Sequence, residues 1–189
     1  MKKIKVKDIL VPTVALLLIC LVATALLAFT NSVTAKKIQE NSVQKENSSR
    51  AIVLPEAAEF SEAQTLESGV SYCVGTKDSK EVGYVFTSGA KGYGGTVSVM
   101  IGMDEDGVIT GIEILSHDET PGLGANSTKP EFKDRFKGKS GTLTVDKTSN
   151  DGQNVQAITA ATITSKAVVS AVNAATEAFN QIKGGAVNG

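Results

Sequence analysis

Hydroxyl side chains gather in one short segment near the end of the chain, residues 159–165, which read TAATITS. After this segment apolar residues recur at intervals of four and three, which predicts an α-helix over residues 165–182 that ends before two glycines. Thr162 and Thr164 therefore fall where a helix start offers unpaired N–H groups and positive dipole charge, which suits a phosphate. The same hydroxyls are typical of an ordinary helix cap, so the segment alone leaves both uses open.

Two loops carry an unusual density of glycine and could contact a ligand. The first is Gly-Tyr-Gly-Gly at residues 92–95, and the second is Glu-Thr-Pro-Gly-Leu-Gly-Ala at residues 119–125. Glycine permits close backbone approach and positive φ angles, which serve a loop that wraps a planar ligand and equally a loop that makes a tight turn. If the loops only make tight turns, Tyr93 would merely cover the edge of a sheet.

These segments need a scaffold, and the pattern of apolar residues predicts one. The clearest signal is a hairpin of residues 96–103 and 108–115, in which apolar residues alternate with small or polar ones around an acidic turn. Further strand signals occur at residues 70–74, 82–87 and 142–145, and residues 51–66 suggest a short strand or helical piece. We therefore expect an α+β fold, a mostly antiparallel sheet with helices packed on it.

Charge and metal-ligating residues exclude two classes of function. The net charge is −1, and residues 1–8 carry +3, so the remainder of the chain carries −4 and is not expected to bind nucleic acid. One histidine and two widely separated cysteines cannot form a metal cluster, and the acidic turn lacks the spaced ligands of a calcium loop. We expect no metal site, and no disulfide within the folded domain.

The start of the chain predicts a membrane helix. Residues 9–29 contain no charged side chain, and at about 1.5 Å per residue they can cross the ~30 Å hydrocarbon core. Lys2, Lys3, Lys5 and Lys7 precede them, and no lysine or arginine follows until Lys36, so the N-terminus should stay in the cytoplasm and the rest should be exported. The alternative is a signal peptide cleaved after residues 33–35, although the apolar stretch exceeds the usual ~7–15 residues.

The chain thus divides into five parts of a single-pass protein of the cell membrane. They are a cytoplasmic N-terminus (1–8), a transmembrane helix (9–29), a linker (30–50), an extracytoplasmic domain (51–183) and a tail (184–189). The linker is rich in Asn, Ser, Gln and Lys. It is expected to be either a frayed helix in the interfacial zone or a flexible spacer.

Several motifs, in one order, resemble a known family. They are Lys91-Gly-Tyr-Gly-Gly, the strand pair, His117-Asp-Glu-Thr-Pro-Gly-Leu-Gly, and the hydroxyl-rich segment before a helix rich in alanine and valine. Together they resemble the covalent FMN-binding domain in the G subunit of the Rnf ion-translocating electron-transport complex, over about residues 51–182, and the single N-terminal span matches this family too. The C subunit of the sodium-translocating NADH:quinone oxidoreductase shares the domain but is usually longer. The departures are Ala160 where the family usually has glycine, Gln156 where an acidic residue is common, and Thr96 in place of a frequent proline.

The resemblance implies where a flavin is held. In the family a flavin transferase joins the FMN phosphate to the last threonine of a Ser/Thr-Gly-Ala-Thr motif, and the matching residue is Thr162. By the same resemblance the second glycine loop lies against the isoalloxazine ring, Glu119 and Tyr93 support it, and His117 either tunes the flavin or anchors the loop. The implied cofactor-binding residues are Tyr93, Glu119, Thr120, Gly122, Leu123, Gly124, Thr159, Ala161, Thr162, Ile163, Thr164 and Ser165. None of them is implied as a catalytic residue.

The function implied is that of an electron-transfer flavoprotein subunit in a membrane-bound, redox-driven cation-translocating complex, rather than a complete enzyme. Its partners would be other membrane subunits, a flavin transferase for maturation and membrane lipid. Two alternatives stay open. One is a free-standing anchored flavodomain for extracellular electron transfer or a reductase partner, and the other is an anchored binding or assembly module without flavin.

Overall fold

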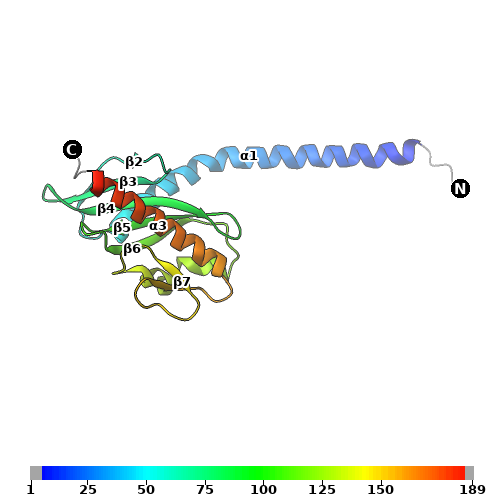
Figure 1. Cartoon of the computed structure of the whole chain (residues 1–189). Helices are drawn as coiled ribbons and strands as arrows, with labels where there is room; N and C mark the ends of the chain where they lie inside the picture. The colour runs from blue at the N-terminus through cyan, green and yellow to red at the C-terminus, as the bar shows by residue number, and fades with distance from the viewer. Residues whose placement is uncertain (1–5, 186–189) are drawn as a thin grey trace. The chain divides into compact units, whose positions relative to one another are not determined.

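The computed structural model describes residues 6–185 and contains two compact units, Met1–Gln44 and Lys45–Gly189 (Figure 1). Lys2, Lys3 and Lys5, which support the expected orientation, and residues 186–189 of the expected tail lie outside the described residues.

The first unit is helical. Its described residues, 6–44, lie within α1 (Val6–Val53), where Ile9–Ala35 is long and apolar enough to cross a membrane, with a mean hydropathy of 2.7 and no buried residue. The polar residues 31–50 continue this helix. The division of the chain at residues 29, 50 and 183 stays a prediction.

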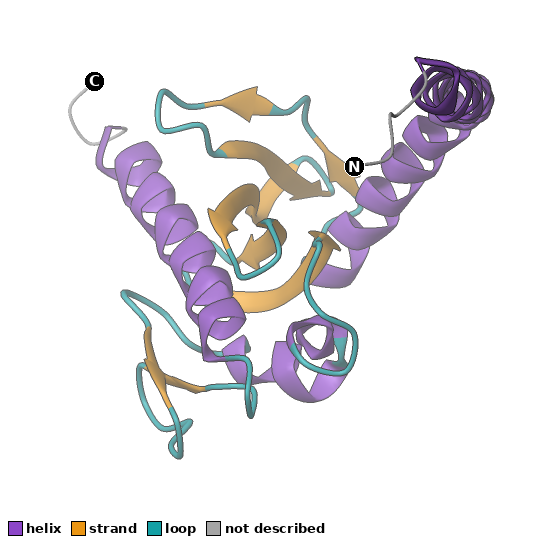
Figure 2. Ribbon diagram, turned by 90° about the vertical axis from the view of Figure 1, so that its right-hand side faces the viewer, coloured by secondary structure: helices purple, strands orange, loops and turns teal. Residues whose placement is uncertain are grey.

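The second unit is built on one antiparallel sheet, which confirms the expected α+β fold class (Figure 2). Its strands run in the order β1-β3-β4-β5-β6, and β2 pairs with β3. The strands are β1 (Glu59–Phe60), β2 (Gln64–Thr65), β3 (Ser71–Lys77), β4 (Lys80–Lys91), β5 (Thr96–Met103) and β6 (Ile109–Ser116). The predicted hairpin is therefore the β5–β6 pair, in which Ile101 lies opposite Ile112.

Helices cover both faces of this sheet. On one face α3 (Thr162–Gly185) packs against β4 and β5, and its Val172 and Phe179 join the alternate β5 residues Val97, Val99 and Ile101 in the larger core. Side chains on a strand alternate between faces, so Met100 points the other way. There it packs with Val53 at the end of α1, with Leu54, which follows the helix, and with Cys73 and Val85.

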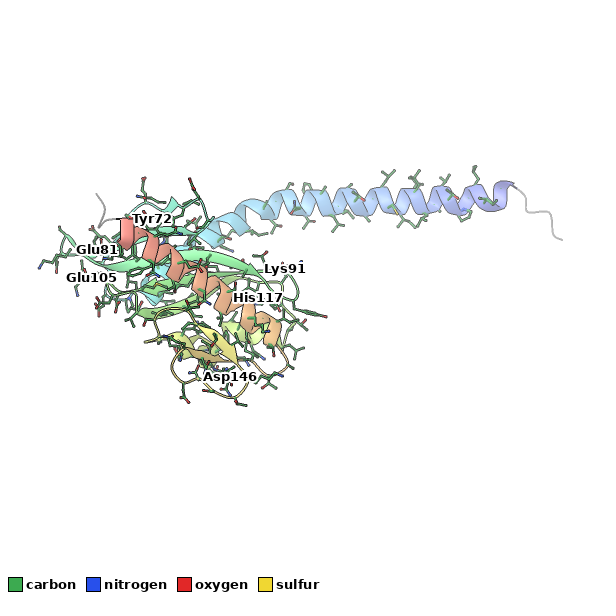
Figure 3. All side chains as sticks on the ribbon, in the orientation of Figure 1. Tyr72, Glu81, Lys91, Glu105, His117 and Asp146 are labelled. Carbon is green, nitrogen blue, oxygen red and sulfur yellow. The ribbon has the colours of Figure 1, made fainter. Side chains whose placement is uncertain are left out.

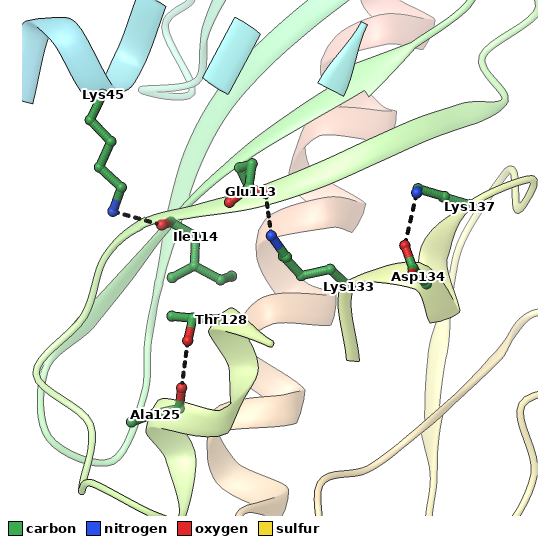
Figure 4. Close-up of polar contacts among 8 residues, drawn as sticks. All are labelled: Lys45, Glu113, Ile114, Ala125, Thr128, Lys133, Asp134 and Lys137. Carbon is green, nitrogen blue, oxygen red and sulfur yellow. Dashed lines mark hydrogen bonds and ion pairs between the residues drawn. The ribbon is translucent and has the colours of Figure 1, made fainter. Parts of the chain in front are cut away.

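The end of α1 is also joined to β6 by polar contacts (Figure 4). The Lys45 ammonium donates to the carbonyl oxygens of Ile114, at 3.0 Å, and of Leu115. Thr110 donates its hydroxyl to the carbonyl oxygen of Val53. These bonds fix the last turns of α1 on the strand that leads into the second glycine loop.

The segment between β6 and α3 departs most from the sequence-based expectation. It contains the short helices η1 (Gly124–Thr128), α2 (Pro130–Lys133) and η2 (Asp134–Phe136), none of which was predicted. The expected strand at residues 142–145 is β7 (Thr144–Asp146), which pairs in parallel with an unpredicted strand, β8 (Asn154–Gln156). The helix predicted from residue 165 begins three residues earlier, at Thr162.

Candidate functional site

The start of α3 and the two glycine loops meet at one cavity. Lys91 and His117, labelled in Figure 3, mark the strand ends from which the two loops leave. The cavity has a volume of about 610 Å³, within the ~300–1,000 Å³ range of small-molecule sites. It is lined by Tyr93, Glu119, Thr120, Leu123, Gly124, Ala160, Ala161, Thr162, Ile163 and Thr164. Nine of these ten residues belong to the set that the resemblance implies, and Ala160 is the addition.

Three residues of the implied set do not line this cavity. Thr159 and Gly122 line a neighbouring cavity of about 450 Å³, which also contains Lys129 and Arg135. Ser165 is fully buried, and its hydroxyl accepts the Ile158 N–H at 2.9 Å and donates to the Ala161 carbonyl at 3.0 Å. Ser165 therefore shapes the loop that enters the helix.

The second glycine loop owes its shape to local backbone bonds. The N–H groups of Leu123 and Ala125 both donate to the Thr120 carbonyl, and Gly122, which lies between Thr120 and Leu123, has a φ of +78°. A residue with a side chain rarely adopts this backbone angle, and this accounts for glycine at the position without reference to a ligand. The tight-turn interpretation of the loop is thus sufficient for Gly122 itself.

The first turn of α3 has no side-chain cap at its N-cap position. That position is held by Ala161, whose carbonyl accepts the Ser165 N–H but whose methyl side chain offers no oxygen. The first N–H groups of a helix have no partner within the helix, and the first turn of α3 contains no acidic residue. Positive dipole charge therefore faces the cavity at Thr162, uncompensated by a cap.

The approach to this helix is conformationally unusual. Ala160 has a φ of +61°, in the left-handed region that is unfavourable for a residue with a Cβ atom. A glycine would take this conformation without that penalty. The backbone thus supplies a physical reason for the glycine that the resemblance places at this position.

The three hydroxyl groups at the helix start differ in their access to the cavity. Thr164 is 1% exposed and donates its hydroxyl to the Glu119 carboxylate, while Ser165 is 0% exposed and bonded within the loop. Thr162 is half-buried at the cavity wall. Of the three, Thr162 is therefore the most accessible from the cavity.

Glu119 connects the loops that surround the cavity. Its side chain is 5% exposed, and Oε1 accepts the N–H groups of Tyr93 at 2.8 Å and Gly94 at 3.1 Å, while Oε2 accepts the Thr164 hydroxyl at 2.5 Å. His117 Nδ1 accepts the Glu119 N–H at 3.2 Å, a contact that anchors the loop. One carboxylate thus joins the second glycine loop to the first and to α3.

The pKa of Glu119 results from opposing influences. Burial acts to raise the pKa of this carboxyl, but the hydrogen bonds from Thr164, Gly94 and Tyr93 and the charge of His117 outweigh it. The pKa is therefore held below its usual value, and the group is ionised at neutral pH. Burial of a charge is tolerated because donors surround it.

Gly124 leaves room for this carboxylate. A Cβ atom at Gly124 would lie 2.4 Å from Glu119 Oε2 and 2.5 Å from Thr164 Oγ1, closer than atoms can approach. The sequence offered a ligand or a tight turn as reasons for the glycines in this loop. At Gly124 the reason is neither, because the space is taken by a buried side chain of the same loop.

Apolar side chains surround the cavity mouth. Within the described part of the second unit, large apolar side chains are exposed at four positions, and three of them, Tyr93, Leu123 and Ile163, line this cavity. Exposed apolar groups gathered at one place mark binding sites in soluble domains. The site thus combines apolar walls with a polar helix start, which suits a planar aromatic molecule that carries a phosphate.

Comparison with known proteins gives matches over most of the chain. Residues 92–177 match the family model of the FMN-binding domain, and residues 1–51 match that of the RnfG N-terminal region. The chain is 34% identical over 167 residues to the G subunit of the proton-translocating ferredoxin:NAD(+) oxidoreductase complex of Clostridium ljungdahlii, covering 88% of this chain and 89% of that one. It is 39% identical over 186 residues, with the same coverage, to the G subunit of the Na(+)-translocating ferredoxin:NAD(+) oxidoreductase complex of Acetobacterium woodii.

A solved structure is similar as well. The C subunit of the Na(+)-translocating NADH-quinone reductase from Parabacteroides distasonis aligns with a TM-score of 0.51 and 28% identity. The alignment covers 60% of this chain and 61% of that chain.

Proposed function

Because the chain belongs to the family of G subunits of Rnf ion-translocating oxidoreductase complexes, we propose that it holds FMN as a phosphoester on Thr162 and transfers electrons through this flavin. With its FMN-binding domain, the chain is an FMN electron-transfer subunit of an ion-translocating complex, and other subunits of that complex are its partners. The attachment at Thr162, the residues around the flavin and the flavin transferase that would load it are the proposal.

The observation that carries the proposal is the uncapped start of α3 at the cavity wall. A phosphate ester on the Thr162 hydroxyl would lie beside the unpaired N–H groups of the first helical turn, and the helix dipole favours its negative charge. Ala161 at the N-cap position leaves these groups to the phosphate, because its side chain cannot accept a hydrogen bond.

The cavity walls support the placement of the ring system. Tyr93, Leu123 and Ile163 offer apolar surface to the isoalloxazine, and Thr120 adds a polar group at the loop. Bound flavin would supply the redox chemistry, whereas the chain's own residues bind it and set its surroundings. The whole cofactor-binding set implied by the sequence is kept in this proposal, with Ser165 and Gly122 acting on the shape of the loops.

The attachment step balances as a transfer to a hydroxyl. A bond forms between Thr162 Oγ1 and the flavin phosphorus, a phosphoanhydride bond of an activated flavin nucleotide breaks, and the hydroxyl proton leaves with the departing phosphate. Glu119 is not the base for this proton, because its carboxylate already accepts the Thr164 hydroxyl and two backbone N–H groups. We therefore assign the activation of the hydroxyl to the flavin transferase.

The attachment is tested by coexpression of the full chain with a flavin transferase. We expect flavin fluorescence to stay with the denatured chain and an FMN-sized mass increment on the peptide that contains Thr162. Thr162→Ala should remove both, and Thr159→Ala, at an exposed hydroxyl that lines the neighbouring cavity, should remove neither. An increment on Thr159, Thr164 or Ser165 would show that another hydroxyl is the acceptor.

The chain associates with a membrane, in agreement with its apolar helix and its membrane-complex relatives. We propose a single pass in contact with lipid, with residues 1–8 in the cytoplasm and the flavin domain on the opposite side. A reporter fused after Gly189 should be active only when exported. Activity of a cytoplasmic reporter at the same point would reverse the orientation, and a mature N-terminus near Lys36 would replace the anchor with a signal peptide.

A further inference from the structure

We propose that the buried Glu119 carboxylate lowers the reduction potential of the flavin by holding a fixed negative charge at the wall of its cavity. This inference rests on the proposed function, because it concerns a flavin in the cavity that Glu119 lines. It gives Glu119 an electrostatic role in electron transfer besides its role in joining the loops.

The charge is held in place by the fold. Both carboxylate oxygens are engaged, Oε1 by the N–H groups of Tyr93 and Gly94 and Oε2 by the Thr164 hydroxyl. All three donors are neutral, so they stabilise the negative charge without cancelling it. With 5% of its surface exposed, the side chain is shielded from the water and salt that weaken the field of a surface carboxylate.

The direction of the effect follows from the charge that reduction adds. An electron delivered to the flavin by a neighbouring redox centre, or by dithionite in a titration, adds negative charge to the ring system. A fixed negative charge nearby raises the free energy of this reduced state more than that of the oxidised state. The potential is therefore lower than it would be beside a neutral side chain of the same shape.

Glu119→Gln separates the charge from the shape. The glutamine oxygen can still accept the two backbone N–H groups, and its amide can donate to the Thr164 hydroxyl oxygen, so the three segments remain joined. The full chain, loaded with flavin and purified in detergent, is titrated with dithionite and redox mediators. We expect the one-electron reduction equilibrium of the variant to shift about tenfold toward reduction, an increase of about 59 mV.

Asp118→Asn is the matched control, because it removes the same charge one residue away. Asp118 is exposed to solvent, so its field is screened and the change should shift the potential by less than a third as much. Thr164→Val removes one donor from the carboxylate and so raises the pKa of Glu119. This variant should therefore lose the negative charge at a higher pH than the wild type, and its potential should rise relative to that of the wild type as the pH is lowered from neutral.

The measured potentials test the electrostatic role of Glu119, and the state of the flavin tests the attachment to Thr162. A potential that is unchanged or lower in Glu119→Gln, in a chain that still carries flavin, would overturn the electrostatic role. If that variant does not fold or load, the potential of Thr164→Val relative to the wild type decides instead, and a difference that is the same at neutral and acidic pH overturns the role. Flavin held without a covalent bond would refute the attachment to Thr162 but leave the comparison of potentials valid. A wild-type chain without any flavin would overturn both proposals.

Discussion

On one face of the sheet α3 buries a continuous apolar stripe against β4 and β5, while on the other face only the last residues of α1 reach the core. The α3 face carries the cavity at its helix start. The α1 face carries none of the cavity residues, but it holds the domain to the helix that continues into the membrane-spanning segment. One face therefore carries the cavity, and the other carries the contacts with the end of α1.

Strand β6 connects the end of α1 to the second glycine loop. Lys45 on α1 hydrogen-bonds the carbonyl groups of Ile114 and Leu115, and two residues later His117 supports the loop that holds Glu119. The last turns of α1 thus contact the strand from which the second glycine loop leaves. These turns, from Lys45 onward, belong to the second unit, so the folded domain includes the end of α1.

The first prediction concerns the contribution of each face of the sheet to the stability of the domain. Leu54→Ala should lower the free energy of unfolding by about 2–5 kcal/mol, as Met103→Ala should on the α3 face, because both side chains are at most 1% exposed. Urea denaturation of the full chain in detergent, followed by circular dichroism, measures both. Ile52→Ala, at an exposed neighbour of Leu54, should change the stability by no more than about 0.5 kcal/mol. A Leu54→Ala effect as small as this control would mean that the core cluster around Leu54 contributes little to the stability of the domain.

The sequence predicted the α3 face far better than the α1 face, for a physical reason. The stripe of α3 and the alternation of β5 repeat over many residues, so their periods are visible in the sequence. The end of α1 buries Val53 and Leu54 after twenty mainly polar residues, and two apolar residues define no period. Its contacts with β6 involve backbone carbonyl groups, which every sequence contains.

The candidate site was predictable in part, and the features that were not predicted share a cause with those at the end of α1. The resemblance placed Tyr93, Leu123 and Thr162 in one site, and all three line one cavity. The start of α3 at Thr162 was missed because β-branched residues favour helices poorly and Ala161 gives no capping signal. The resemblance implied that Glu119 supports the second glycine loop, but its hydrogen-bond partners were not predictable, because they include two backbone N–H groups about 25 residues away in the chain.

The second prediction concerns Glu119 at the cavity and the dependence of the stability of the fold on pH. Because the folded-state pKa of Glu119 lies below its usual value near 4.5, the ionised group stabilises the fold above that value. This contribution is lost as the pH falls through the lowered folded-state pKa. Between about pH 5 and 3, the flavin-free wild-type chain should therefore lose more stability than Glu119→Gln.

Thermal unfolding of both proteins across this range measures the difference, which should be smaller than the effect of Leu54→Ala. Asp146, whose pKa is lowered by hydrogen bonds from Thr148 and Ser149, titrates in both proteins and does not enter the difference. Parallel pH profiles would mean that the hydrogen bonds to Glu119 do not favour its ionised form. Repeating the comparison with His117→Asn would show how much of the lowering comes from the histidine.

The smallest effect is expected where the chain enters α3, at a residue with a strained backbone conformation. Ala160 is held at a φ of +61°, which destabilises an alanine by about 1–2 kcal/mol relative to its preferred conformations. Glycine removes this strain but loses more backbone entropy on folding, by about 0.5–1 kcal/mol. Ala160→Gly should therefore raise the free energy of unfolding by about 0.5–1 kcal/mol. Ala174→Gly, in the interior of α3, should lower it by about 1 kcal/mol, because there the alanine is already in a favourable conformation. Urea denaturation of the flavin-free chains gives both values, and a loss of stability in both variants would show that the left-handed turn before Thr162 is absent from the folded protein.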